Sequence, residues 1–192
     1  MKTRIKAIFD QQALLNDEEW ELFSNHLSEV YFEKGEVILD QGQVEKYLTF
    51  IVHGTARMYT IDEYMNEFSI EFPSDNCFCC SYGSFVTQRP SNIGVEALEP
   101  IKAYRISFDD LQFLYSKSHT GERLGRINAE LFLAHKEQRE IMLLTLNAKQ
   151  RYLSLISSNP KILNLVKLEH IATYLGITPQ SLSRIRNNIR IN

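Results

Sequence analysis

The sequence has little of several features that would place it in a specialised class. Its 192 residues include only three cysteines and one tryptophan. An odd, small number of cysteines argues against a disulfide framework. No apolar run approaches the roughly 20 residues that a membrane-spanning helix needs. Hydrophobic residues make up 44% and charged residues 23% of the chain, which is typical of globular proteins. We therefore expect a folded cytoplasmic protein.

Signatures of catalysis are also missing. The sequence has no Gly-x-Gly-x-x-Gly, no phosphate loop and no Ser-His-Asp signature. A metal-dependent enzyme built on a cupin-like β-roll would be the alternative, but such sites use clustered histidines. This chain has no His-x-His pair, and nothing marks any of its histidines as a ligand. We predict no catalytic residue, no metal site and no resident cofactor. The five scattered histidines are His26, His53, His119, His135 and His170.

Charge is divided unevenly along the chain. Residues 148–192 contain seven basic side chains and one acidic one, a net charge of +6, whereas the whole chain carries −3. Residues 1–147 therefore carry −9. An acidic body with a basic C-terminal end is the asymmetry expected when that end meets a polyanion, although a solvated charged surface would look the same.

The hydrophobic pattern predicts three regions. Residues 4–27 are predicted to be helical, with cap-like residues from Asn16 onward. From residue 30 to about 106, short runs rich in β-branched and aromatic residues alternate with turn signals, which predicts an all-β roll or barrel. After Ser107, a plausible helix cap, the period becomes helical again. We thus predict an α+β protein with residues 1–118 as a jelly-roll-like β-roll domain, 119–147 as a dimerisation helix and 148–192 as a helical helix-turn-helix domain.

The predicted long helix, about residues 121–147, carries a heptad seam. Apolar residues recur at alternating steps of three and four, the pattern of two helices packed side by side. The alternative is a helix that packs on its own β-domain, and both can hold because a second apolar face exists. The residues predicted to form the dimer contact are Leu124, Ile127, Leu131, Ala134, Gln138 and Ile141.

Residues 168–187 carry the strongest local signal. Gly176 supplies the positive φ that ends a first short helix, and Ala172 is small where a second helix crosses it. Thr178 can cap the second helix, and Pro179 suits its first position because no amide donor is needed there. This pattern predicts a helix-turn-helix.

The exposed face of the second helix is suited to double-stranded DNA. Arg184 can bond a guanine edge, and Gln180 or Asn187 can pair with adenine. Phosphate contacts are expected from the remaining polar residues. A helical hairpin that only mediates protein contacts is the competing interpretation. The predicted DNA-binding residues are Gln180, Ser181, Ser183, Arg184, Arg186, Asn187, Arg190 and Lys167.

Residues 20–190 together resemble the Crp/Fnr family of bacterial regulators. The matching segments are 34–42 and 48–54, whose glycines fall at the family's β-roll turns, with further fit at 97–99 and at the 106–108 strand-to-helix junction. The resemblance implies a homodimer, a cyclic-nucleotide-binding-like effector domain and binding to a two-fold-symmetric operator under control of a small signal. It also makes RNA polymerase a further partner to consider. A ligand-binding or interaction module with a non-functional helix-turn-helix is the alternative.

The sequence departs from the cyclic-AMP-binding members of that family. Ser81 stands where their ribose-binding Glu would be, and Ser91 where their phosphate-binding Arg would be. Losing the only cation that faces a buried phosphate should cost several kcal/mol. We therefore expect an effector other than cyclic AMP, of unknown identity. The residues expected to line its pocket are Ser81, Tyr82, Ser84, Arg89, Ser91 and Asn92.

Cys77, Cys79 and Cys80 raise the separate possibility of redox sensing. Iron–sulfur members of the family use four cysteines, and this chain has three, at a spacing too close for such a cluster. Ordinary buried cysteines are the simpler interpretation, and thiol sensing stays open at this stage.

Overall fold

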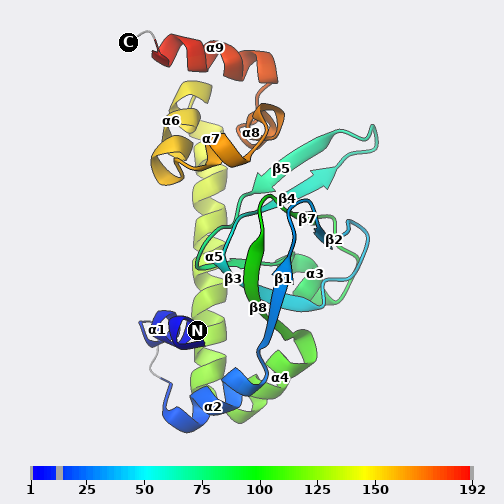
Figure 1. The fold of residues 1–192 in the computed structure, drawn as a ribbon, viewed down its shortest axis with the longest axis vertical. Coiled ribbons are helices and arrows are strands. Elements are labelled where there is room, and N and C mark those ends of the chain that lie inside the picture. Colours follow the sequence, from blue (N-terminus) through cyan, green and yellow to red (C-terminus); the bar gives the residue numbers. More distant parts are fainter. Residues whose placement is uncertain (1, 12–14, 191–192) are drawn as a thin grey trace.

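The computed structural model describes residues 2–11 and 15–190, with the side chains of residues 2–4 and 190 outside the described part. Helices lie at both ends of the chain and a β-roll lies between them (Figure 1). The chain opens with α1 (Lys2–Asp10) and α2 (Asp17–Asn25). Asn16 caps α2 as predicted, because its side chain accepts a hydrogen bond from the Glu19 amide at 2.8 Å and the Glu19 carboxylate accepts one from the Asn16 amide at 3.2 Å.

The predicted all-β region is confirmed as two antiparallel four-stranded sheets. Each sheet mixes strands that are distant in the sequence, so the chain crosses repeatedly between the two layers. In spatial order, the first sheet contains β1 (Ser28–Phe32), β8 (Ile101–Ser107), β3 (Tyr47–His53) and β6 (Cys77–Cys79). The second contains β2 (Val37–Leu39), β7 (Gly94–Ala97), β4 (Ala56–Ile61) and β5 (Glu67–Glu71).

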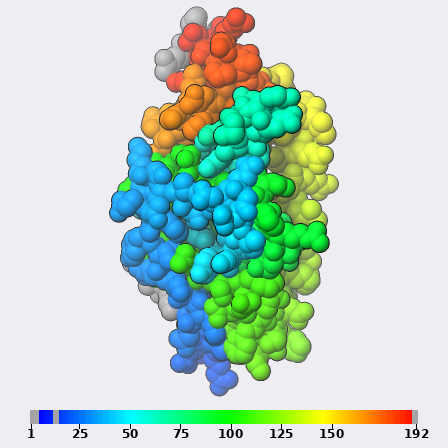
Figure 2. Space-filling model, turned by 90° about the vertical axis from the view of Figure 1, so that its right-hand side faces the viewer, coloured from blue at the N-terminus to red at the C-terminus, as the bar shows by residue number. Residues whose placement is uncertain are grey.

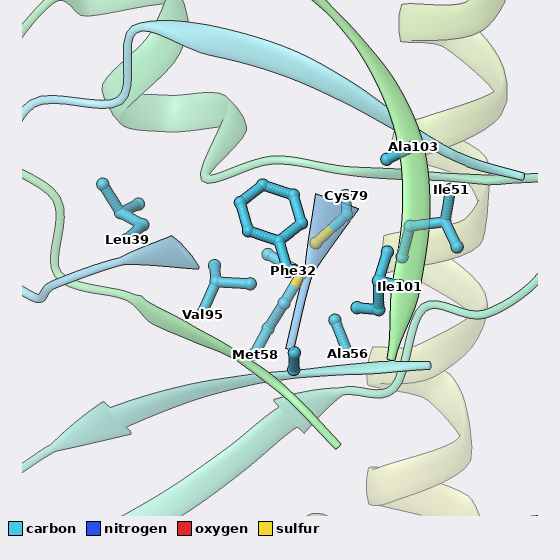
Figure 3. Packing of buried hydrophobic residues seen from close by; sticks show 10 residues of the cluster. Phe32, Leu39, Ile51, Ala56, Met58, Cys79, Val95, Ile101 and Ala103 are labelled. Carbon is cyan, nitrogen blue, oxygen red and sulfur yellow. The ribbon is translucent and has the colours of Figure 1, made fainter. Parts of the chain in front are cut away.

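The two faces of the first sheet pack against different parts of the protein. In the β3–β8 register, Ile51 lies opposite Ala103 and Phe50 opposite Tyr104. Because successive side chains of a strand point to opposite faces, the first pair points into the roll and the second pair points away. Figure 3 shows the interior cluster. Its buried members are Phe32, Leu39, Ile51, Ala56, Met58, Cys79, Val95, Ala97, Ile101 and Ala103.

Helices cover the outer face of this first sheet. Phe50 and Tyr104 belong there to a second buried cluster, with Ile5 and Phe9 from α1 and Leu124 from the long helix. The short helix α3 (Tyr82–Thr87) follows β6, and α4 (Phe108–Lys117) follows β8. Ser107 caps α4, accepting a hydrogen bond from the Asp110 amide at 3.1 Å, as the sequence predicted.

Helix α5 (His119–Thr145) runs the length of the roll for 27 residues (Figure 1). Its beginning is buried and the rest of its apolar seam is not. Leu124 is buried and Ile127 half-buried, whereas Leu131 is 55% exposed and Ile141 44% exposed. Ala134 and Gln138 are exposed as well.

The C-terminal helices form a core of their own. They are α6 (Ala148–Ser158), α7 (Ile162–Leu165), α8 (Leu168–Tyr174) and α9 (Pro179–Arg190). Ile171, Ala172, Leu175 and Leu182 are almost completely buried in it. Among the residues that the structure describes, no helix is both long enough and apolar enough to cross a membrane.

Candidate nucleic-acid interface and sensor pocket

The turn between α8 and α9 has the chemistry that the sequence predicted. Gly176 has a φ of +66°, a conformation that costs glycine little. The Ile177 amide then donates to the Ala172 carbonyl at 3.0 Å, so one of the last carbonyls of α8 is satisfied. Thr178 Oγ1 accepts a hydrogen bond from the Ser181 amide at 3.2 Å, and Pro179 is the first residue of α9. The angle between the two helices is thus set by local hydrogen bonds.

Helix α9 lies at the far end of the molecule from α2 (Figure 1). On the inner side of this helix, Leu182 is buried and Ile185 packs against the same core. Gln180, Arg184 and Asn187 are exposed. Their spacing of four and three residues places them on one side of the helix.

The other predicted DNA-binding residues are placed differently. Ser181, Ser183 and Arg186 are half-buried on α9. Lys167 is exposed at the start of α8, with its Nζ 3.8 Å from the Glu169 carboxylate. The side chain of Arg190 lies outside the described residues. The structure therefore gathers three of the predicted side chains on one open face and places Lys167 on a separate element.

One basic residue of the C-terminal region has a structural task instead. The Arg151 guanidinium donates hydrogen bonds to the carbonyls of Leu175 at 2.9 Å and Leu146 at 2.5 Å. It also reaches the Leu143 carbonyl at 3.3 Å. Arg151 thus joins the end of α5 to the end of α8, and much of its hydrogen-bonding capacity is used within the protein. The net charge of +6 for residues 148–192 includes Arg151. The positive charge that this region presents on its surface is therefore smaller than the sequence indicates.

The β-roll touches the C-terminal helices directly. Figure 2 shows the β4–β5 hairpin against the C-terminal helices. The Ser69 amide of β5 donates to Thr173 Oγ1 of α8 at 3.1 Å, and the two hydroxyl oxygens lie 3.3 Å apart. Just beyond β5, the Phe72 ring packs on the Tyr174 ring with 5.1 Å between centroids.

Arg139 of α5 completes this contact from the other side. Its guanidinium lies 3.7 Å from the Tyr174 ring centroid, a cation–π arrangement. It also donates a hydrogen bond to the Tyr174 carbonyl. Tyr174 is therefore held between β5 and α5, and burial raises its pKa to about 12. The position of Tyr174 in α8 thus depends on contacts with both the β-roll and α5.

Arg57 of β4 supports the same region from inside the sheet. It is 1% exposed and forms ion pairs with Glu67 at 2.7 Å and Glu96 at 3.0 Å. Its Nε donates to Ser69 Oγ at 3.0 Å, the same serine that meets Thr173. Sequence reasoning missed this group, although an arginine in the otherwise uncharged strand segment Ala56–Ile61 was a visible signal, since a buried charge requires partners.

His170 of α8 lies against this ion pair. Its Nε2 is 3.8 Å from the Glu67 carboxylate, while its Nδ1 is buried without a hydrogen-bond partner. Burial lowers the pKa of His170, and the nearby Arg57 charge lowers it further, against the opposing effect of Glu169, Glu96 and Glu67. The neutral form of His170 is thus favoured while α8 contacts the β-roll.

The three serines predicted to line an effector pocket are all buried and bonded to the protein. The Ser91 and Ser81 hydroxyls lie 2.7 Å apart, and Ser91 Oγ also accepts from the Ile93 amide at 2.9 Å. Ser84 Oγ accepts from the Glu45 amide at 3.0 Å and donates to the Arg89 carbonyl. The Ser81 and Ser91 hydroxyls thus meet each other, and the Ser84 hydroxyl is bonded to backbone groups.

Glu45 adds an acid to this cluster. It is buried, and its carboxylate accepts hydrogen bonds from the Tyr47 amide at 3.1 Å and the Ser81 amide at 3.3 Å. Burial raises the pKa of Glu45. The backbone amides that a phosphate would need in this loop are thus partly taken by a carboxylate, which repels a second anion.

The remaining predicted pocket residues do not join the serines. The side chains of Arg89 and Asn92 are exposed. Tyr82 instead faces α5, where its ring lies 5.2 Å from that of Phe132. The structure therefore divides the predicted set into a closed serine cluster, two exposed residues and one tyrosine beside α5.

The cysteines are placed unfavourably for thiol chemistry. Cys79 and Cys80 are buried and Cys77 is exposed, all three as free thiols. Burial raises the pKa of the Cys79 and Cys80 thiols, and the nearby Glu45 raises them further. Because the thiolate is the reactive form, this placement argues against redox sensing through these two residues. Within the described ranges, no three His, Cys, Asp or Glu side chains come together as a metal site would require.

Comparison with known proteins agrees with this arrangement. Residues 29–118 match the family model of the cyclic nucleotide-binding domain. No curated protein matches the chain. Among solved structures, FixK2 from Bradyrhizobium japonicum has a TM-score of 0.70 at 16% identity, covering 86% of this chain and 85% of that one. The fold is Crp/Fnr-like.

Two further structures support the same fold over most of both chains. CLP from Xanthomonas campestris, a regulator responsive to c-di-GMP, has a TM-score of 0.70 at 14% identity over 92% of each chain. A protein of Eubacterium rectale assigned to the crp/fnr family of transcriptional regulators has a TM-score of 0.72 at 16% identity, covering 92% of this chain and 84% of that one. The Crp/Fnr-like fold thus includes α5 and the C-terminal helices as well as the roll.

Proposed function

We propose that the protein is a dimeric DNA-binding transcription regulator of Crp/Fnr type that responds to a small signal other than cyclic AMP. The observation that carries the proposal is the open polar face of α9, where Gln180, Arg184 and Asn187 are exposed above a buried apolar side. A recognition helix needs this division, because one face must pack on the protein while the other reaches base edges. The Crp/Fnr-like fold supports the same function.

The roles of the side chains follow from their chemistry. Arg184 would bond a guanine edge bidentately, and Gln180 or Asn187 would pair with adenine. Arg186, Arg190 and Lys167 would meet phosphates, as would the hydroxyls of Ser181 and Ser183. Phosphate contacts set the orientation of the protein on the duplex, whereas the base contacts select the sequence.

Helix α5 would provide the dimer contact. Leu131 and Ile141 are large apolar residues left exposed in a single chain, at heptad positions with Ala134 and Gln138 between them. A second α5 packed against this seam would cover them. The two recognition helices would then read half-sites about one helical turn, roughly 10 bp, apart.

The closed serine cluster supports an effector other than cyclic AMP. A cyclic phosphate would have to separate Ser81 from Ser91, which lie 2.7 Å apart, and then remain beside the buried Glu45 carboxylate without a facing cation. Neutral hydroxyls cannot compensate a buried negative charge. RNA polymerase remains a further partner to test in transcription assays.

Salt-dependent binding to a two-fold-symmetric DNA fragment tests the proposal. We expect the logarithm of the affinity to fall linearly with the logarithm of the salt concentration. Arg184→Ala should remove about 1–3 kcal/mol of discrimination at one base position. Arg126→Ala is the matched control, because Arg126 is exposed on α5 and paired with Glu130. DNA affinity unaffected by Arg184→Ala in every sequence context would overturn the groove-reading model. Failure to bind any DNA would instead favour a ligand-binding or interaction module.

A further inference from the structure

A cavity lies outside the roll, between α5 and the outer face of the first sheet. Its volume is about 470 Å³, within the range of roughly 300–1,000 Å³ that is usual for small-molecule sites. Phe50, Tyr104 and Ile106 line it from the sheet, and Phe9 of α1 and Phe23 of α2 line it as well. Because these strand residues point away from the roll interior, the cavity is distinct from the closed serine cluster.

Small residues on α5 leave this space open. Gly121, Gly125 and Ala129 follow one another at four-residue steps, so they share one side of the helix, and all three line the cavity. At Gly121 an added Cβ would lie 3.4 Å from the Ser118 side chain, so this glycine allows a close contact with the residue before α5. At Gly125 the neighbour Tyr115 requires the absence of a side chain, because an added Cβ would lie 2.2 Å from the tyrosine oxygen. Ala129 also lines the cavity, and a larger side chain at this position would fill it.

The walls indicate the chemistry of an occupant. Most lining residues are aliphatic or aromatic, and the lining charges stand together at one end. There the Glu71 carboxylate lies 3.8 Å from both Lys136 Nζ and His135 Nδ1. Among the described lining residues, the two basic side chains thus share this one carboxylate, so the site suits an apolar body with at most a small polar head.

One lining residue of the cavity also contacts the C-terminal helices. Phe72 lines it and packs on Tyr174 of α8. A molecule that displaces Phe72 would therefore act on the element that holds α8. We infer that this cavity binds a predominantly apolar small molecule, aromatic or aliphatic, and that this molecule is the signal of the regulator. The second part of the inference rests on the proposed function; the first does not.

Binding of N-phenyl-1-naphthylamine, an uncharged apolar fluorophore, tests the cavity without DNA. Trp20, the only tryptophan, stacks on Phe23 with 6.1 Å between ring centroids, and Phe23 lines the cavity. Energy transfer from Trp20 therefore reports binding near this site, and the comparison of two phenylalanine variants tests whether the probe occupies the cavity. We expect saturable binding of one probe per chain. Ala129→Phe should weaken it at least tenfold, whereas Glu122→Phe, which adds the same ring at an exposed position of α5, should leave it unchanged.

Several results would overturn the inference. They are the absence of saturable binding to the wild-type chain, equal affinity in both phenylalanine variants, and binding to an enforced monomer but not to the dimer. The last would mean that a second α5 fills the groove. If Ala129→Phe fails to fold by circular dichroism, Ala129→Leu provides a smaller filling step with a smaller expected loss. DNA affinity with and without the probe is measured separately, so failure of the regulator proposal leaves the binding result interpretable.

Discussion

Replacing Thr173 by valine should loosen the contact between the β-roll and helix α8. Valine keeps the shape of threonine but removes the oxygen that accepts the hydrogen bond from the Ser69 amide at 3.1 Å. Ser69 is 5% exposed, so water cannot easily replace the lost acceptor. A buried donor left without a partner costs about 1–3 kcal/mol. The local opening equilibrium between β5 and α8 should shift by that amount.

Hydrogen exchange measured by mass spectrometry would detect this shift. Because about 1.4 kcal/mol corresponds to a factor of ten, exchange protection in β5 and α8 should fall about 5- to 150-fold. Protection in β3 and β8 should not change, because these strands belong to the first sheet. Thr173→Ser keeps the hydroxyl and is the matched control. Unchanged protection in β5, or an equal loss in β3, would refute the reasoning.

Three other experiments test separate parts of the structure. Ile141→Asp places a charge on a seam residue that is 44% exposed in the single chain, so sedimentation should show a weaker dimer, whereas Glu140→Asp beside it should have no effect. Calorimetry should detect no micromolar binding of cyclic AMP, and a measured micromolar affinity would contradict the closed serine cluster. The pKa of His170 is lowered from 6.5 while α8 contacts β5. When the two elements separate, His170 regains its ordinary pKa, so the separated state binds a proton first as the pH falls. The contact with β5 should therefore weaken as the pH falls below about 6.5 and recover above it. His170→Gln should remove this dependence in the exchange assay, and His119→Gln, at an exposed position, should not.

Local chemistry explains why much of the fold could be predicted. The caps at Asn16, Ser107 and Thr178 and the positive φ of Gly176 depend on residues a few positions apart, which a sequence displays directly. The alternation of strands and the return to helical period after residue 107 are local in the same sense. Several strands and helices were therefore found within a few residues of their ends, whereas helix α3 lies inside the region predicted to be all-β and was missed.

The candidate pocket could not be predicted in the same way. Its residues come from all five helices α1 to α5 and from strands of both sheets, and nothing in the sequence relates Phe50 to Ala129. The predicted pocket residues were adjacent in sequence, yet the structure uses Ser81, Ser84 and Ser91 to close a loop and turns Tyr82 toward α5. Of the predicted pocket residues, Tyr82 lines the cavity, whereas Ser81, Ser84, Arg89, Ser91 and Asn92 do not.

By itself, the sequence determined the α+β order of elements and the polar face of α9. These follow from periodicity and capping, which act over one or two turns of helix. Only the tertiary structure decided that Arg151 serves backbone carbonyls rather than an external partner, that Arg57 and Ser69 join the roll to α8, and that small residues of α5 leave a cavity. Such contacts join residues up to about a hundred positions apart, as Ser69 and Thr173 do, and their energies depend on burial that forms only when the chain is folded.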